Sequence, residues 1–254
     1  MISRYEAVLN GQPLSAISAD ILILDISYPP ASIDFSTYRG AKRHGNRVYR
    51  QYVDHLDVII TFAIRAYNTQ KRQTICNAVQ QWAKNGGILQ TNDHSGQRLR
   101  CVLTTPPTIQ SVLKWTDPIS MTFTAYALPF WEEVFPSSLT LTGTSGSGTL
   151  FVHGSADGAF FEVDVTPANT LTTLNLVANG RTLSLTGISV AAGTVVKVAY
   201  DDDMIMSIKA GNTSLLNKRS GADDLPIKSG ERNSLSFSAN TSCTVSFKGR
   251  GIWA

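Results

Sequence analysis

The stretch from Leu174 to Thr186 reads LNLVANGRTLSLT, and it decides the fold class of the second half of the chain. Leucines alternate with polar residues on both sides of Asn179-Gly180, which is the period of a half-buried strand. Asn and Gly both tolerate positive φ, so this dipeptide is the strongest short signal for a tight hairpin turn. The stretch therefore predicts a β-hairpin with one face toward a core.

The same alternation recurs on both sides of this hairpin, with turn residues between the runs. Further strands are predicted at 139–142, 150–152, 161–165, 195–198, 204–208, 235–237 and 245–247. The glycines of 143–148 are interpreted as a flexible loop between the first two runs. Many short strands separated by turns are typical of a β-sandwich or jelly roll.

The first half of the chain combines strands with one helix. Apolar runs predict strands at 19–27, 58–64, 99–103 and 120–126. A helix is predicted from about Thr69 to Asn85, with a cap at Asn68 or Thr69 and a left-handed stop at Gly86-Gly87. Its apolar face is formed by Ile75, Val79 and Trp82, with Ala78 and Ala83 beside them. This half is predicted to be α+β, and the whole chain mainly β.

Composition divides the 254 residues near Phe135-Pro136. The part up to Phe135 holds 13 Lys and Arg against 10 Asp and Glu, so it carries the whole net charge of +3. The part from Pro136 is balanced and rich in Ser, Thr, Gly and Asn. We therefore predict two domains, residues 1–135 and 136–254, each of ordinary domain size.

The overall composition excludes several classes of protein. With 43% hydrophobic and 16% charged residues, the chain is neither disordered nor a general nucleic-acid binder. Its aliphatic runs, such as 21–24, are far shorter than the roughly 20 residues that span a bilayer. The first residues do not resemble a secretory signal. We expect a folded protein made in the cytoplasm, with no membrane insertion.

Motifs for catalysis or cofactor binding are missing from the sequence. It has no G-x-S-x-G elbow, no P-loop and no Cys pair with C-x-x-C spacing. Cys76, Cys101 and Cys243 are interpreted as reduced, buried thiols. We predict no catalytic residues, no cofactor and no metal.

Three groups of titratable residues are interpreted as surface features. His55 and Asp57 would share one strand face and supply half a metal site, but no second cluster completes it. Glu132-Glu133 and the run Asp201 to Asp203 lack the spacing of a catalytic pair or a calcium loop.

A basic segment is the one charge feature that indicates a partner. No acidic residue occurs between Asp34 and Asp54, whereas five cations do: Arg39, Lys42, Arg43, Arg47 and Arg50. Gly40 and Gly45 indicate a loop or hairpin. Because arginine and aromatic residues are enriched at contacts, we predict a partner interface here, with a plain solvated hairpin as the alternative.

Several segments, taken in order, resemble one family. They are the strand end Asp25-Ile26-Ser27-Tyr28-Pro29, the basic segment, the helix with Trp82, the strand 121–131, and the segments 215–217, 224–227, 230–233 and 250–253. Together they are similar to the distal tail proteins of long, non-contractile-tailed bacteriophages. The best local match is the stretch from Met121 to Trp131, which ends in an aromatic pair.

The resemblance implies a fold and a role. The first domain would be a tail-tube-like, ring-forming β-sandwich with one helix, and the second a galectin-like, carbohydrate-module-like sandwich. A homo-oligomeric ring, as a hexamer, would join the tail tube protein to host-facing tip or receptor-binding proteins in the virion tail. DNA would pass through the lumen without sequence recognition. The family has no catalytic residues to transfer to this chain.

Two other functions stay open from the sequence. The second domain would bind a cell-surface glycan as an adhesin module, although its one indole, Trp253, lies at the end of the chain. A glycan hydrolase would need a carboxylate pair in a groove, and no spacing in the sequence demands one. The structural role in a phage tail tip is the leading hypothesis.

Overall fold

The computed structural model describes residues 5–38, 47–108, 117–156, 158–200, 205–222 and 224–253. The chain forms two compact units, Met1–Trp131 and Glu132–Ala254, so the division lies close to the composition break at Phe135-Pro136. Both units consist mainly of antiparallel strands, which confirms the predicted mainly-β class. Within the described ranges, no helix is both long and apolar enough to cross a membrane.

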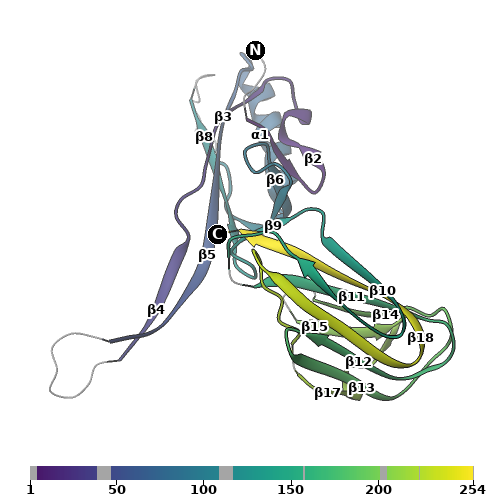
Figure 1. The fold of residues 1–254 in the computed structure, drawn as a ribbon. Coiled ribbons are helices and arrows are strands. Elements are labelled where there is room, and N and C mark those ends of the chain that lie inside the picture. The colour runs from purple at the N-terminus through teal and green to yellow at the C-terminus, as the bar shows by residue number, and fades with distance from the viewer. Residues whose placement is uncertain are drawn as a thin grey trace. The chain divides into compact units, whose positions relative to one another are not determined.

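The described residues of the first unit form strands, one α-helix and one short 3-10 helix (Figure 1). Its elements are β1 (Ala7–Leu9), β2 (Gln12–Pro13), η1 (Leu14–Ala16), β3 (Ile21–Ser27), β4 (Ser32–Tyr38), β5 (Arg47–Ile64), α1 (Thr69–Ala83), β6 (Gly87–Thr91), β7 (Gln97–Thr105) and β8 (Ile119–Ala125), and β9 (Trp131–Glu133) follows at the division. The four strands predicted from apolar runs correspond to β3, β5, β7 and β8, with ends that differ by one or two residues at β3 and β8 and longer observed strands at β5 and β7.

Two small sheets share strand β7 in this unit. Its first half pairs with β6, which continues through β1 to β2. Its second half pairs with β8, which continues through β5 to β3. The core lies on the inner side of β5 and β8, where Val58, Ile60, Phe62, Met121 and Phe123 are fully buried. These residues alternate along their strands, as one buried sheet face requires.

Helix α1 packs on this core through the predicted face. The Asn68 side chain accepts a hydrogen bond from the Gln70 amide and caps the first turn. Ile75, Val79 and Ala83 are buried, and the Trp82 ring meets Phe123 edge-on with centroids 6.1 Å apart. Two details differ from the prediction, because Cys76 is buried on this face and Ala78 is exposed.

The second unit is built of strands with one short 3-10 helix. Its elements are β10 (Ser137–Phe151), β11 (Ala159–Pro167), β12 (Leu171–Ala178), β13 (Arg181–Val190), β14 (Val196–Tyr200), β15 (Met206–Ala210), β16 (Thr213–Ser214), η2 (Leu216–Lys218), β17 (Arg219–Gly221) and β18 (Arg232–Trp253). The predicted hairpin is confirmed: β12 and β13 pair from Ala178 and Arg181 outward, across a turn in which Asn179 and Gly180 have φ of 49° and 83°.

Two long strands, β10 and β18, take part in both sheets of this unit. The C-terminal half of β18 pairs with β11, which continues through β14 and β15 to β16. The N-terminal half of β18 pairs with β12, which continues through β13 to β17. Strand β10 follows β18 along both halves, with a register shift between Gly143 and Ser145. The sheets enclose one apolar core that includes Phe161, Leu176, Leu183 and Phe247.

The predicted glycine loop at 143–148 is wrong, because these residues belong to the continuous strand β10. Gly146 and Gly148 face inward, where a Cβ would lie 3.0 Å from the Phe237 ring and 3.0 Å from Leu139, respectively. The glycines are therefore required by close packing between the layers rather than by flexibility. Similarly, the two strands predicted at 235–237 and 245–247 are parts of the single strand β18.

Candidate assembly interface

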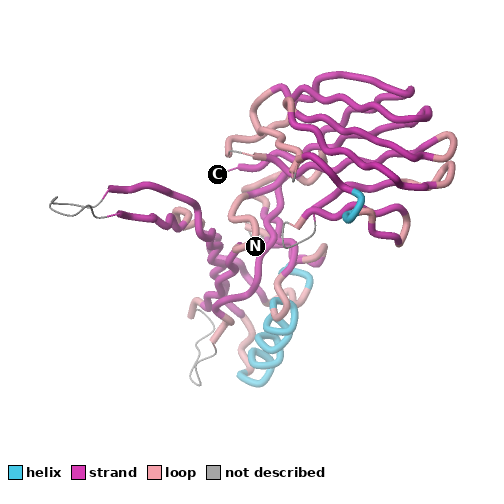
Figure 2. The backbone as a smooth tube through the Cα atoms, turned by 90° about the horizontal axis from the view of Figure 1, so that it is seen from below, coloured by secondary structure: helices cyan, strands magenta, loops and turns pink. Residues whose placement is uncertain are grey.

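Strands β4 and β5 form an arm that leaves the body of the first unit (Figures 1 and 2). We define the arm as residues 32–38 and 47–55. From Leu56 onward β5 pairs with β8, and from Ile59 also with β3, whereas its first part pairs with β4. The arm thus has two strands where the body has a sheet over a core, and a two-stranded ribbon alone is marginally stable in water.

Apolar side chains are exposed on the arm. Ile33 and Phe35 lie two residues apart on one face and are 44% and 50% exposed. Val53 pairs with Ile33 on that face and is half-buried. Farther along the same strand, Val58, Ile60 and Phe62 are fully buried. Strand β5 is therefore a core strand from Val58 onward, whereas in the arm its partner strand β4 exposes apolar side chains to solvent.

The opposite face of the arm has a polar cross-strand contact. Asp34 pairs with Tyr52, whose hydroxyl donates to the Asp34 carboxylate at 2.6 Å. Hydrogen bonds from the Tyr52 hydroxyl and the Phe35 amide hold the pKa of the exposed Asp34 carboxyl below its usual value. The contact fixes the register of the two strands near the middle of the arm.

Two of the five predicted interface cations, Arg47 and Arg50, belong to strand β5 of this arm. Tyr38 pairs with Arg47 and Ser36 with Arg50, so the prediction of a hairpin is confirmed by the backbone. Arg39, Lys42 and Arg43 lie in the connection, outside the described residues. Whether the five cations contact a partner stays a prediction.

His55 and Asp57, which were interpreted as a surface feature rather than a metal site, lie in a polar cluster at the base of the arm. His55 Nδ1 lies 2.8 Å from the Asp54 carboxylate, and its Nε2 lies 3.9 Å from that of Asp57. Asp57 also accepts a hydrogen bond from the Thr124 hydroxyl at 2.6 Å. Within the described ranges, no three His, Cys, Asp or Glu side chains are grouped so that they could hold a metal ion.

The three cysteines are unpaired and buried, as predicted. Burial raises the pKa of Cys76 to about 11 and that of Cys101 to about 12, and it also raises the pKa of Cys243. Thiolate is the nucleophilic form of cysteine, so these groups are held in the unreactive thiol form at neutral pH.

Glu132 and Glu133, the other titratable candidates among the described residues, have different surroundings. Glu132 is fully buried, whereas a Glu133 carboxylate oxygen lies 3.7 Å from Nδ1 of His153. The His94 ring stacks on Trp131 with centroids 4.1 Å apart. The run of acids from Asp201 to Asp203 lies outside the described residues.

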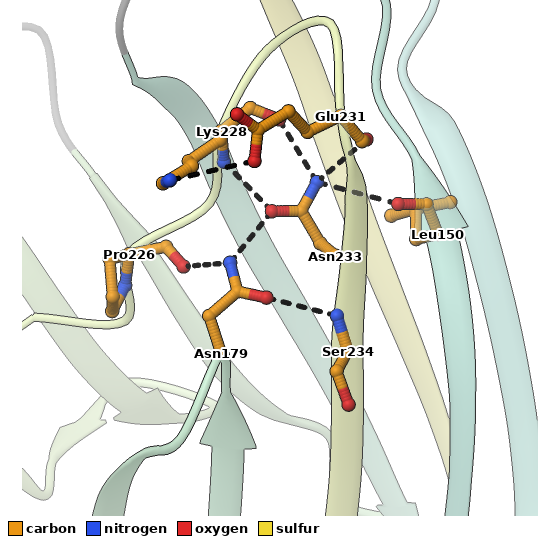
Figure 3. Close-up of polar contacts among 7 residues, drawn as sticks. All are labelled: Leu150, Asn179, Pro226, Lys228, Glu231, Asn233 and Ser234. Atoms are coloured by element: carbon orange, nitrogen blue, oxygen red, sulfur yellow. Dashed lines mark hydrogen bonds and ion pairs between the residues drawn. The ribbon is translucent and has the colours of Figure 1, made fainter.

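The segment 230–233, which contributed to the family resemblance, forms a buried polar network (Figure 3). Asn233 is fully buried, and its Nδ2 donates to the carbonyls of Lys228 at 2.9 Å, Glu231 at 3.2 Å and Leu150 at 3.4 Å. Its Oδ1 accepts from the Lys228 amide and from Asn179 Nδ2, each at 2.8 Å. The side chain therefore ties a loop to strands β10 and β18.

Asn179 extends this network into the β12–β13 turn. Its Nδ2 also donates to the Pro226 carbonyl at 3.0 Å, and its Oδ1 accepts from the Ser234 amide at 2.9 Å. Residues from three separate chain segments are thus fixed by two asparagines (Figure 3). A buried network with satisfied polar groups makes the local backbone rigid, so the role of this motif is structural.

The outer surface of the β11–β14–β18 sheet carries a cluster of charges. Lys248 Nζ lies 3.2 Å from the Glu162 carboxylate and 2.5 Å from that of Asp164, and Lys197 Nζ lies 3.0 Å from Glu162. Burial opposes ionisation of Glu162, but hydrogen bonds from Lys197 and Lys248 outweigh it and lower its pKa. Both carboxylates are therefore ion-paired rather than arranged as a separate acid and base.

Solved structures share this fold. The Dit protein (gp 19.1) of phage SPP1, described as a paradigm of the hub adsorption apparatus in phages that infect Gram-positive bacteria, matches 97% of this chain and 98% of its own, with TM-score 0.70 and 11% identity. A chain of the phage P2 baseplate in its activated conformation with Ca matches 99% of this chain and 98% of its own, with TM-score 0.52 and 9% identity. No family model and no curated protein matches the chain.

Proposed function

We propose that this chain is a structural subunit of a phage tail tip, the hub of a baseplate, and that copies of it form a ring between the tail tube and host-facing proteins. The observation that carries the proposal is the fold shared with SPP1 Dit over nearly the whole length of both chains. The family resemblance of the sequence segments points to the same role, and it implies six copies in the ring.

The arm is proposed as a ring contact between neighbouring copies. In a closed ring each copy presents two different, complementary surfaces. The arm places Ile33 and Phe35 in solvent on a ribbon that has no core of its own. A neighbouring copy that covered them would remove apolar area from water and support the ribbon.

The basic connection of the arm is proposed to contact the tail tube protein or a neighbour. The cations of the connection and of the start of β5, Arg39, Lys42, Arg43, Arg47 and Arg50, have no acidic residue between them in the sequence. Such a cluster favours an acidic partner surface, and exposed charge contacts weaken as salt screens them. The proposed role needs no catalytic group, cofactor or metal.

The ring is tested by the mass of the full chain in solution. Light scattering after size-exclusion chromatography is expected to show a closed oligomer, and negative-stain images are expected to show a hollow ring. The double variant Ile33→Ser/Phe35→Ser is expected to lose the ring. The matched control Val195→Ser/Leu216→Ser removes two side chains of similar exposure, 42% each, from the second unit and is expected to keep it. A monomer at every concentration, also with the tube protein present, would refute the proposal.

The basic connection is tested separately. Replacing Arg39, Lys42 and Arg43 with Gln is expected to weaken binding to the tail tube protein or to a neighbour, and the loss is expected to be largest at low salt. Replacing the exposed Lys84, Lys209 and Lys218 with Gln removes the same charge from other surfaces and is the matched control. Equal binding by both triple variants would remove the basic segment from the proposed interface.

A further inference from the structure

Strand β10 has an open edge of unusual length and composition. Among the described residues of the second unit, 14 of its 15 residues pair with β18 on one side, and no strand pairs with the other side. The strand contains no Lys, Arg, Asp, Glu or Pro. Natural sheets protect long edges with charges, proline or a short strand, because unpaired N–H and C=O groups bind other strands.

The other outer strands of this unit follow that rule. At the far end of one sheet, β16 has two residues, and at the far end of the other, β17 has three and includes Arg219. Only a bulge between Gly143 and Ser145 interrupts β10, and it divides the edge into two runs of seven residues, 137–143 and 145–151. The edge is thus far longer than the others and has no charge.

The inner face of β10 packs on the core on both sides of the bulge. Leu139 and Leu141 face inward on the first run, and Gly146 and Gly148 face inward opposite them. On the outer face, Thr140, Thr142, Ser147 and Thr149 are exposed. Up to Thr149 the outer face therefore carries small hydroxyl side chains that do not obstruct a neighbour, and the larger Phe151, 46% exposed, lies only at the end of the strand.

We propose that the β10 edge pairs with the β10 edge of a second copy of this chain, antiparallel and across a two-fold axis. Only an extended strand offers the complementary groups that such an edge needs. At a two-fold axis a side chain meets its own copy, so a charged strand would repel itself, whereas Thr and Ser pairs across strands are favourable. The absence of charge from β10 suits a second copy for this reason.

This contact differs from the proposed ring contact. A ring is closed by head-to-tail contacts between different surfaces, whereas β10 pairing joins the same surface of two copies. The two contacts can therefore coexist, and pairing through β10 would join two rings or, without a ring, two single chains. The inference does not depend on the proposed function, since each contact can be removed alone.

The test is the mass of the full chain, measured by sedimentation velocity over a range of concentrations. Thr140→Lys/Ser147→Lys places charges on the edge and is expected to weaken pairing at least about tenfold and to halve the assembly mass. Thr173→Lys/Thr244→Lys adds the same charge to exposed positions of inner strands and is expected to leave the mass unchanged. In the arm variant Ile33→Ser/Phe35→Ser, a dimer is expected to remain, and adding the edge substitutions is expected to give a monomer.

The outcomes separate this inference from the proposed ring. A single ring with the same mass in the wild type and the edge variant would overturn β10 pairing and leave the ring intact. A wild-type dimer that only the edge substitutions dissociate would support β10 pairing without the ring. Among single cysteines at Thr140, Thr142 and Ser147, those nearest the two-fold axis should form dimers with a short thiol cross-linker and those farther away should not, because only residues near the axis face their own copies. Thr173→Cys should form none. If the β10 edge bound a strand of another tail protein but not a second copy of this chain, the proposed β10 pairing would be wrong.

Discussion

The arm and strand β10 both place long strands at an edge, but they differ in support and in charge. The arm has apolar Ile33 and Phe35 in solvent and a basic connection, with no core below it. Strand β10 covers a sandwich core with its inner face and has neutral hydroxyls outside. The comparison indicates that the arm would bind a partner through its exposed side chains, whereas β10, which has no charged side chains, would bind through the backbone groups of its edge.

The largest effect on stability is expected where β10 and β18 are joined by Asn233. Asn233→Ala removes all the hydrogen bonds of a fully buried side chain, and the buried backbone groups left without partners are expected to cost about 3 kcal/mol of unfolding free energy. Asn175→Ala on the same sheet removes an exposed hydrogen bond to the Ser238 hydroxyl and is expected to cost far less. If Asn233→Ala and Asn175→Ala had equal midpoints in urea denaturation, Asn233 would not be a rigid anchor at this end of β10.

A smaller loss is expected from filling the inner face of β10. In Gly146→Val the new side chain meets the Phe237 ring and Leu141, so overpacking is expected to cost about 1–3 kcal/mol. Ser147→Val places the same side chain on the exposed face next to it and is expected to be nearly neutral. Thermal unfolding of both variants measures the difference. A neutral Gly146→Val would mean that the glycines serve flexibility after all.

The smallest effect is expected at the polar contact of the arm. The lowered pKa of Asp34 means that its ionised form is favoured in the folded arm, so this contribution is present at neutral pH and is lost as pH falls through the folded-state pKa. Tyr52→Phe removes the main donor, and NMR titration is expected to show the Asp34 pKa rising toward its ordinary value of about 3.9. Tyr126→Phe, another exposed tyrosine, should leave it unchanged. An unaltered Asp34 pKa in Tyr52→Phe would show that the arm lacks this contact in solution.

Local pattern alone predicted most of the strands and the single helix. The β12–β13 hairpin, helix α1 and strands β3, β5, β7 and β8 of the first unit could be predicted because hydrophobic period and turn chemistry act over a few residues. The same argument failed at 143–148, where glycine has the same sequence signature in a flexible loop and in a tightly packed strand. Only the tertiary structure separates the two cases, because it places the Phe237 ring against Gly146 and the Leu139 side chain against Gly148.

For the two candidate interfaces, the sequence showed which residue types are present, and the tertiary structure decided which of them are exposed. The basic segment was visible as charge, but the exposure of Ile33 and Phe35 follows from β5 leaving its sheet, and apolar residues in a strand normally indicate a core. The neutral run of β10 was equally visible, but its place at an edge depends on pairing with β18, about a hundred residues later in the chain. The sequence by itself determined the mainly-β class, the helix and the charge of the first half, because these depend on neighbouring residues. The tertiary structure decided which strands meet solvent, because strand pairing is a long-range contact that local period does not encode.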